Sequence, residues 1–197
     1  MMTPAEQFQH SGYAVLKNVI NPEEADQLYQ YTIKNLEKGN LDDGQVPGSP
    51  SFYQDKEVVQ LQQRLKPQLE CAINKTLLPV FNYHRIYRTG AVLRMHKDST
   101  RAEISASINL GQKGDPWDLW LLDYDENPHR IILEPGDALI YNGLKLYHWR
   151  GKLTYSDYVS QIMFHFVDKK GQNTFAARME WVRKIRKKIR QLWGMEY

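Results

Sequence analysis

The spacing of apolar residues divides the chain into two parts near residue 79. Before that point most apolar positions follow a helical period. One helix is predicted after Asn21-Pro22-Glu23-Glu24, which offers an N-cap and a proline at the first helical position. A second is predicted from Val58 to Ile73, where Pro67 introduces a kink or a division. The apolar run at residues 13–20 fits a strand ahead of the first helix.

From Val80 to Val167 the pattern changes to short apolar and aromatic runs separated by turn residues. It predicts a mainly β fold with flanking helices, whose core is a double-sheet jelly roll with a metal or ligand at its open end. The Gly- and Pro-rich loop at 44–50 is either a flap over such a site or a simple connection. Strands are predicted near residues 80–88, 91–98, 103–110, 117–122, 131–133, 137–141, 145–149 and 158–167.

Length and composition narrow the class of protein. The 197 residues fit a single domain at 1–170, with a helical N-terminal support (1–78) and a jelly-roll core (79–170), followed by a C-terminal helix at 171–197. The sequence has no apolar run of about 18 residues and no signal-like N-terminus, so we expect a soluble, cytoplasmic protein without a membrane span. The single cysteine, Cys71, excludes an intramolecular disulfide and is interpreted as an inert core residue.

Charge is distributed unevenly along the chain. The net charge is +3, yet the stretch from Arg178 to Arg190 carries +6 by itself, which leaves the remainder mildly acidic. Apolar residues recur within this stretch at helical spacing, at Trp181, Ile185, Ile189 and Leu192. It therefore predicts a basic amphipathic helix. Such a helix either packs its apolar stripe on the body or meets nucleic acid, an acidic protein or a membrane surface.

The candidate chemistry lies in three residues of the β region. His96 and Asp98 are two residues apart, so in a strand both side chains point to the same face and can reach one metal ion. His148, on a later predicted strand, supplies a third ligand if the two strands are neighbours. Two histidines and one carboxylate leave three coordination positions open, the arrangement that non-haem Fe(II) oxygenases use.

Four further motifs cover the whole β region: residues 85–90 before His96, 103–110 after Asp98, 135–141, and Tyr147-His148-Trp149-Arg150. Together with the three candidate ligands they carry a resemblance. The sequence resembles the Fe(II)/2-oxoglutarate-dependent dioxygenases, in particular their prolyl-hydroxylase-like branch. The resemblance implies a double-stranded β-helix (cupin-like) core and Fe(II) at His96, Asp98 and His148. It also implies hydroxylation of an unactivated C–H bond with dioxygen, coupled to conversion of 2-oxoglutarate to succinate and CO2.

The same resemblance suggests how 2-oxoglutarate would bind, with one departure. It assigns the far carboxylate of 2-oxoglutarate to Tyr87, which is otherwise interpreted as a core tyrosine. The Arg or Lys expected on the last strand is missing, because that position falls near Tyr158. Strand parity offers three substitutes, Arg85, Arg150 and Arg94. We favour Arg85 and Arg150. Asn109 is a further candidate for contact with 2-oxoglutarate.

Two classes of function remain open at this stage. The first is a dioxygenase that acts on a protein side chain, a small molecule or, less favoured, a nucleic acid. The second is a non-catalytic, cupin-like metal-binding module that acts through a partner of the basic helix, an interpretation that the missing cation near Tyr158 supports. A zinc hydrolase with the same three ligands is a weaker third option, since no general base stands beside them.

Overall fold

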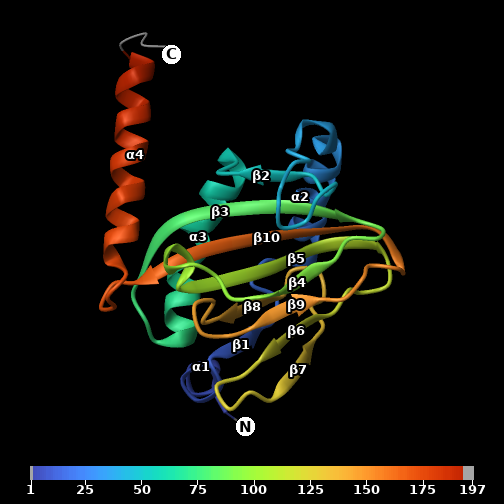
Figure 1. Ribbon diagram of the computed structural model, residues 1–197, viewed down its shortest axis with the longest axis horizontal. Helices are drawn as coiled ribbons and strands as arrows, with labels where there is room; N and C mark the ends of the chain where they lie inside the picture. The colour runs from blue at the N-terminus through green and yellow to red at the C-terminus, as the bar shows by residue number, and fades with distance from the viewer. Residues whose placement is uncertain (1, 193–197) are drawn as a thin grey trace.

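Ten strands form two antiparallel sheets in the part of the chain described by the computed structural model, residues 2–192. The larger sheet has the order β1-β8-β5-β10-β3-β2 and the smaller one β4-β9-β6-β7 (Figure 1). The strands are β1 (Tyr13–Leu16), β2 (Ser51–Tyr53), β3 (Leu77–Arg88), β4 (Leu93–His96), β5 (Ile104–Gly114), β6 (Leu119–Leu122), β7 (Pro128–Ile131), β8 (Ala138–Tyr141), β9 (His148–Arg150) and β10 (Ser156–Asp168). The helices are α1 (Pro4–Ser11), α2 (Pro22–Lys34), α3 (Lys56–Ile73) and α4 (Thr174–Leu192), with 3-10 turns η1 (Leu36–Lys38) and η2 (Thr100–Ala102).

The central strands of the larger sheet are buried on both faces, and their residues alternate between two environments. Apolar residues of β5 and β10, such as Ile108 and Phe164, pack with α1 and α3 in one hydrophobic core. The intervening residues face the smaller sheet and are mostly polar: Ser105, Ser107, Gln161, Met163 and His165. The alternation thus places an apolar core outside the larger sheet and a polar cavity between the two sheets.

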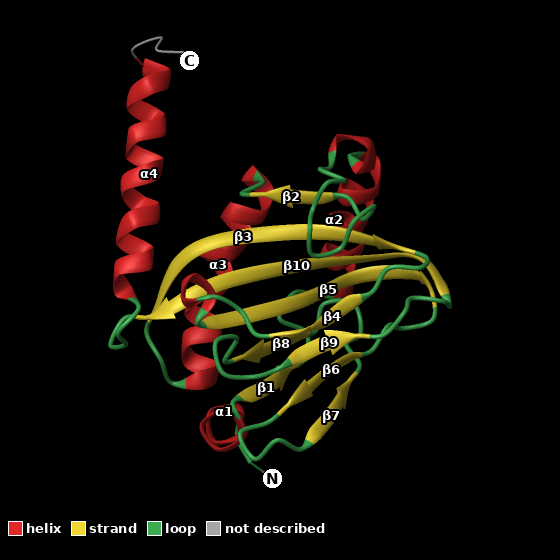
Figure 2. Cartoon of the chain, viewed as in Figure 1, coloured by secondary structure: helices red, strands yellow, loops and turns green. Residues whose placement is uncertain are grey.

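The predicted mainly β fold with flanking helices is confirmed (Figure 2). Two strand predictions are displaced. The strand expected at 131–133 is β7, which begins earlier, at Pro128. The prediction treated Pro128 as a turn residue, but β7 is an edge strand, and an edge strand tolerates a proline as its first residue. The strand expected at 145–149 begins only at His148, because the amides of Lys145 and Leu146 bond back to Asn142 in a turn.

The N-terminal half contains two more differences from the sequence-based expectations. α3 runs without a break from Lys56 to Ile73, with Pro67 inside it. Its apolar stripe, which includes Leu65 and Leu69, stays buried on both sides of the proline, so packing keeps the helix in one piece. Cys71 is exposed rather than buried, because it lies on the opposite side of α3 from that stripe.

A tight turn fixes the start of β8, which ends at the cavity. Gly136 has a φ of +92°, and a Cβ there would lie 2.4 Å from the carbonyl oxygen of Ile20. The Asp137 carboxylate accepts hydrogen bonds from the amides of Asn18 (3.1 Å) and Glu134 (3.0 Å) and pairs with Lys17. The Pro135-Gly136-Asp137 turn therefore ties β1 to β8 and has a structural role.

α4 is the predicted C-terminal helix, and it extends away from both sheets (Figure 2). It contacts β3, β10 and η2, and Glu180 near its start is buried and accepts a hydrogen bond from Arg101 (2.8 Å). The side chains of Trp181, Ile189 and Leu192 lie outside the described residues, so the amphipathic character of this helix stays a prediction. No helix within residues 2–192 is both long enough and apolar enough to cross a membrane.

His84 makes the stability of the fold depend on pH. It is fully buried, stacks on Phe52 at 4.1 Å, and neither ring nitrogen has a hydrogen-bond partner in the described residues. Burial lowers the pKa of His84 to about 4. Since the unfolded chain binds this proton near pH 6.5, the free energy of unfolding should fall by about 3 kcal/mol between pH 6.5 and 4 through this residue.

We therefore expect His84→Phe to flatten the pH dependence of stability. Urea unfolding between pH 4.5 and 7 should show a slope reduced by up to about 1.4 kcal/mol per pH unit relative to the wild type. His10→Gln, at an exposed position on α1, serves as the control and should leave the slope unchanged. An equal slope in the wild type and His84→Phe would contradict the prediction.

Candidate metal centre

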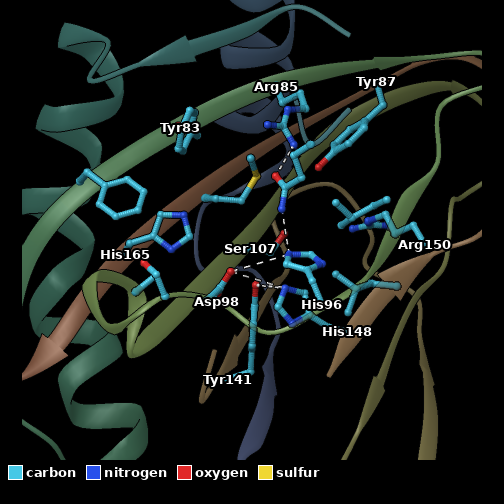
Figure 3. Close-up of a pocket in the computed structure, with 17 residues that line it drawn as sticks. Tyr83, Arg85, Tyr87, His96, Asp98, Ser107, Tyr141, His148, Arg150 and His165 are labelled. Atoms are coloured by element: carbon cyan, nitrogen blue, oxygen red, sulfur yellow. Dashed lines mark hydrogen bonds and ion pairs between the residues drawn. The ribbon is translucent and has the colours of Figure 1, made fainter. Parts of the chain in front are cut away.

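The structure brings the three predicted ligands together at one point between the sheets (Figure 3). β4 and β9 are hydrogen-bonded neighbours, and His96 lies directly opposite His148 across them. Asp98 follows β4 and turns back toward both histidines, with its Oδ1 atom 3.8 Å from each Nε2. The three ligand atoms all lie within 4.8 Å of one another, so a single metal ion can bind to all of them.

Backbone carbonyls select the imidazole tautomer that a metal requires. The Nδ1 atom of His96 lies 2.8 Å from the carbonyl oxygen of Arg94, and that of His148 lies 3.2 Å from the carbonyl oxygen of Leu146. Because a carbonyl oxygen only accepts, each Nδ1 carries a proton, so the neutral form of each ring has its lone pair on Nε2, the atom that lies 3.8 Å from Asp98. Burial also lowers the pKa of His148, which keeps this ring in the neutral form that binds metals.

A second set of bonds fixes the Asp98 carboxylate. Its Oδ2 atom accepts a hydrogen bond from the Ser105 hydroxyl (2.7 Å), which leaves Oδ1 for the metal. Ser105 in turn accepts from Nδ1 of His165 at 2.9 Å, and burial lowers the pKa of His165 to about 4, so that ring is neutral. Gly143 packs so closely on Asp98 that a Cβ would lie 2.3 Å from Oδ2.

Removing the Ser105 hydroxyl should weaken metal binding without removing a ligand. We expect Ser105→Ala to lower the affinity for Mn(II) about tenfold, because partners that orient metal ligands are typically worth 10- to 100-fold. Calorimetric titration of the apoprotein measures this. Ser107→Ala is the matched control, since Ser107 lies two residues further on the same face of β5 but bonds Gln161 (3.1 Å). Equal loss in both variants would contradict a specific role of Ser105.

The triad lines a cavity of about 180 Å³ that has two chemically different ends. Figure 3 shows Tyr83 and His165 on one side of the triad and Tyr87 and Arg150 on the other. The first end is largely apolar and aromatic, with Phe81 and Met163 beside Tyr83 and His165. The second end carries a buried positive charge.

Arg150 supplies that charge without a carboxylate partner. It is 3% exposed and donates hydrogen bonds to the carbonyl oxygen of Trp117 and to Oε1 of Gln161 (3.2 Å). Among the described residues no carboxylate lies within ion-pair distance of it; Asp118, whose charge influences Arg150, makes its own ion pair with Arg130. Burial lowers the pKa of Arg150. A buried, unpaired guanidinium beside a cavity is suited to bind an anion.

The other residues predicted to bind 2-oxoglutarate lie in different surroundings. Tyr87 faces the cavity and packs edge-on against Trp117, with ring centroids 4.9 Å apart. Arg85 also lines the cavity, but its charge is paired with Asp43. Burial by itself would raise the pKa of Asp43, but the Arg85 guanidinium and neighbouring hydrogen bonds outweigh it, so the pKa of Asp43 is lowered. Asn109 does not line the cavity: its amide bonds protein partners, including Gln161 (3.0 Å) and the carbonyl oxygen of Leu133 (2.7 Å).

Sequence reasoning missed the roles of three further residues at the centre. Ser105 and Tyr141 lie within motifs that the resemblance covers, but only the structure shows the Tyr141 hydroxyl 3.4 Å from Nε2 of His148. Burial raises the pKa of Tyr141 well above its usual value, so it stays protonated. Gln45 lies in the loop that was either a flap or a connection, and its amide reaches His96 (2.9 Å). No local signal marks Gln45, since the contact spans 51 residues.

No protein-family model and no curated protein matches this sequence, whereas many solved structures share its fold. The prolyl-4-hydroxylase of Pseudomonas putida is 14% identical, with a TM-score of 0.64 over 82% of this chain and 96% of that chain. The non-haem alpha-ketoglutarate-dependent epimerase SnoN from nogalamycin biosynthesis is 11% identical, with a TM-score of 0.71 over 83% of this chain and 80% of that chain. HygX from Streptomyces hygroscopicus, with nickel, 2-oxoglutarate and hygromycin B bound, is 13% identical, with a TM-score of 0.66 over 83% and 85%.

At these identities the similarity establishes the fold. It confirms the double-stranded β-helix core and, at the level of the fold, the resemblance to the Fe(II)/2-oxoglutarate-dependent oxygenases.

Proposed function

We propose that this protein is an Fe(II)- and 2-oxoglutarate-dependent oxygenase. One observation carries the proposal: the ligand atoms of His96, Asp98 and His148 converge on a cavity that ends at Arg150, which is buried and has no carboxylate partner among the described residues. The three ligands suit a divalent metal, and Arg150 suits the distal carboxylate of a dicarboxylic co-substrate. Structures of the same fold contain these groups, since HygX was solved with nickel and 2-oxoglutarate and SnoN with Fe3+ and alpha-ketoglutarate.

The donor set fits the proposed metal. Two neutral imidazoles and one carboxylate suit Fe(II), and a site with three protein ligands keeps positions for 2-oxoglutarate and dioxygen. When bound, the metal and co-substrate would supply the oxidising chemistry: dioxygen would provide one oxygen atom for the conversion of 2-oxoglutarate to succinate and CO2 and the other for oxidation of a C–H bond of the substrate. The chain itself holds the ligands in one tautomer and, through Ser105, in one orientation.

The two ends of the cavity suggest different tasks. Arg150 and Tyr87 would hold the distal carboxylate of 2-oxoglutarate, with Gln161 and Trp117 fixing the guanidinium. The aromatic end, with Tyr83 and His165, lies across the triad from Arg150 and would receive an apolar part of the organic substrate.

The outcome proposed for the substrate is hydroxylation of an unactivated C–H bond in a protein side chain or a small molecule. The fold alone does not choose this outcome, because its members include a prolyl-4-hydroxylase, an epimerase and a carbocyclase. Support comes from the metal site and cavity, which match what hydroxylation requires.

Anaerobic absorption titration tests the proposal. Fe(II) and then 2-oxoglutarate are added to the apoprotein, and a visible charge-transfer band is expected only when both are present. His96→Ala should abolish the band. Metal binding without a band would contradict the co-substrate site, and it would favour a metal-binding module that acts through a partner.

A further inference from the structure

A short segment of the chain contributes Gln45 to the wall of the metal cavity and contacts one of the ligands, His96. We call residues 41–49, between η1 and β2, the strap. Its middle is anchored by Val46, which is 1% exposed and packs in a hydrophobic cluster with Tyr87 and Leu93. Its ends are tied by the amide of Gly48, which donates to the carbonyl oxygen of Leu41 (3.1 Å). The strap is therefore an ordered part of the cavity wall.

Arg85 fixes the orientation of a side chain on the strap. Its Nη1 atom donates to Oε1 of Gln45 (3.0 Å), while its Nη2 atom pairs with the Asp43 carboxylate. A guanidinium has only donors, so the Gln45 oxygen must face Arg85 and the Gln45 NH2 group must face the other way. The amide nitrogen is thereby directed at Nε2 of His96, 2.9 Å away.

The contact between Gln45 and His96 uses the atom that would bind the metal. Nδ1 of His96 donates to the carbonyl oxygen of Arg94, and the Gln45 NH2 group that faces Nε2 can only donate, so Nε2 accepts this hydrogen bond with its lone pair. One lone pair cannot accept a hydrogen bond and bind a metal at the same time. Gln45 and a metal ion therefore compete for His96, and binding of the metal requires the amide to leave.

We propose that Gln45 is a positioning residue that latches the strap onto His96, and that metal binding releases the latch. This inference rests on the proposed function, because it requires the metal centre to be real. Movement of Gln45 also disturbs its hydrogen bond with Arg85. Because Arg85 is paired with Asp43 as well, the change at Gln45 also affects the contact between Arg85 and Asp43 in the strap.

Release of the latch would also connect two cavities. The strap borders a second cavity of about 550 Å³, between itself and the turn after β3, and Gln45 lines both cavities. The second cavity contains Arg88 and Arg94 and no carboxylate. Binding of metal is thus coupled to opening of a cationic approach to the centre.

Mn(II) affinity tests the competition directly. Gln45→Leu keeps the approximate size of the side chain but removes its donor, so Mn(II) should bind about threefold to tenfold more tightly, the worth of one net hydrogen bond. Gln60→Leu, at an exposed site on α3, is the control and should match the wild type.

Hydrogen exchange of the wild-type protein supplies a second, independent measurement. Addition of Mn(II) should increase exchange in the peptide that spans residues 41–49, and Gln45→Leu should show this increased exchange without metal. Unchanged Mn(II) affinity in Gln45→Leu, or unchanged exchange on metal binding, would overturn the latch. If the wild type binds no Mn(II), or if His96→Ala binds it equally well, the proposed metal centre fails as well, so the two failures are distinguishable.

Discussion

His148→Ala is expected to reduce Mn(II) or Fe(II) affinity by more than about 100-fold. Loss of a ligand should exceed the 10- to 100-fold cost of losing a residue that merely orients one. His148 is 2% exposed, and among the described His, Cys, Asp and Glu residues only His96 and Asp98 join it at this point, so no further ligand of these types is placed to replace it. The charge-transfer band expected with Fe(II) and 2-oxoglutarate should disappear in parallel.

Calorimetry with Mn(II) measures the effect, and urea unfolding checks that the variant is folded. His10→Ala, which removes an exposed imidazole on α1, should bind metal as the wild type does. If a folded His148→Ala protein retained wild-type affinity, the assignment of the triad would be wrong.

Arg150→Met should weaken 2-oxoglutarate binding by about 100-fold or more while leaving the fold intact. Truncating one partner of a buried charged pair typically costs 2–5 kcal/mol in binding. Without 2-oxoglutarate, however, Arg150 has no carboxylate partner among the described residues, so its replacement leaves no buried carboxylate of the protein unpaired. Replacement of an uncompensated buried charge by an apolar side chain should therefore maintain or raise the free energy of unfolding.

A pair of keto acids separates this effect from general damage to the site. Pyruvate has the chelating end of 2-oxoglutarate but no distal carboxylate, so its affinity for the Mn(II)-loaded protein should not fall in Arg150→Met. Arg64→Met removes an exposed arginine on α3 that is paired with Glu24, and it should affect neither ligand. Equal loss of both keto acids in Arg150→Met would contradict a specific role for Arg150 at the distal carboxylate.

The contrast between Arg85 and Arg150 shows where sequence reasoning ends. Strand parity correctly places both side chains toward the cavity, because residues two apart on a strand share a face. Strand parity does not predict whether a charged side chain that faces the cavity has an ion-pair partner there. Asp43, 42 residues before Arg85, neutralises that guanidinium, whereas Arg150 stays unpaired among the described residues. Asn109 meets the same limit, since its amide is used within the sheet.

The sequence by itself determined the mainly β fold, the strand faces and the three residues that the structure brings together. These follow from local rules, because a period of two residues and a His-x-Asp spacing are properties of neighbouring residues. Only the tertiary structure decided which arginine has no carboxylate partner among residues 2–192, and that Gln45 reaches the centre. Those features depend on hydrogen bonds and ion pairs between residues far apart in the chain, whose partners are set by packing of the two sheets and the strap.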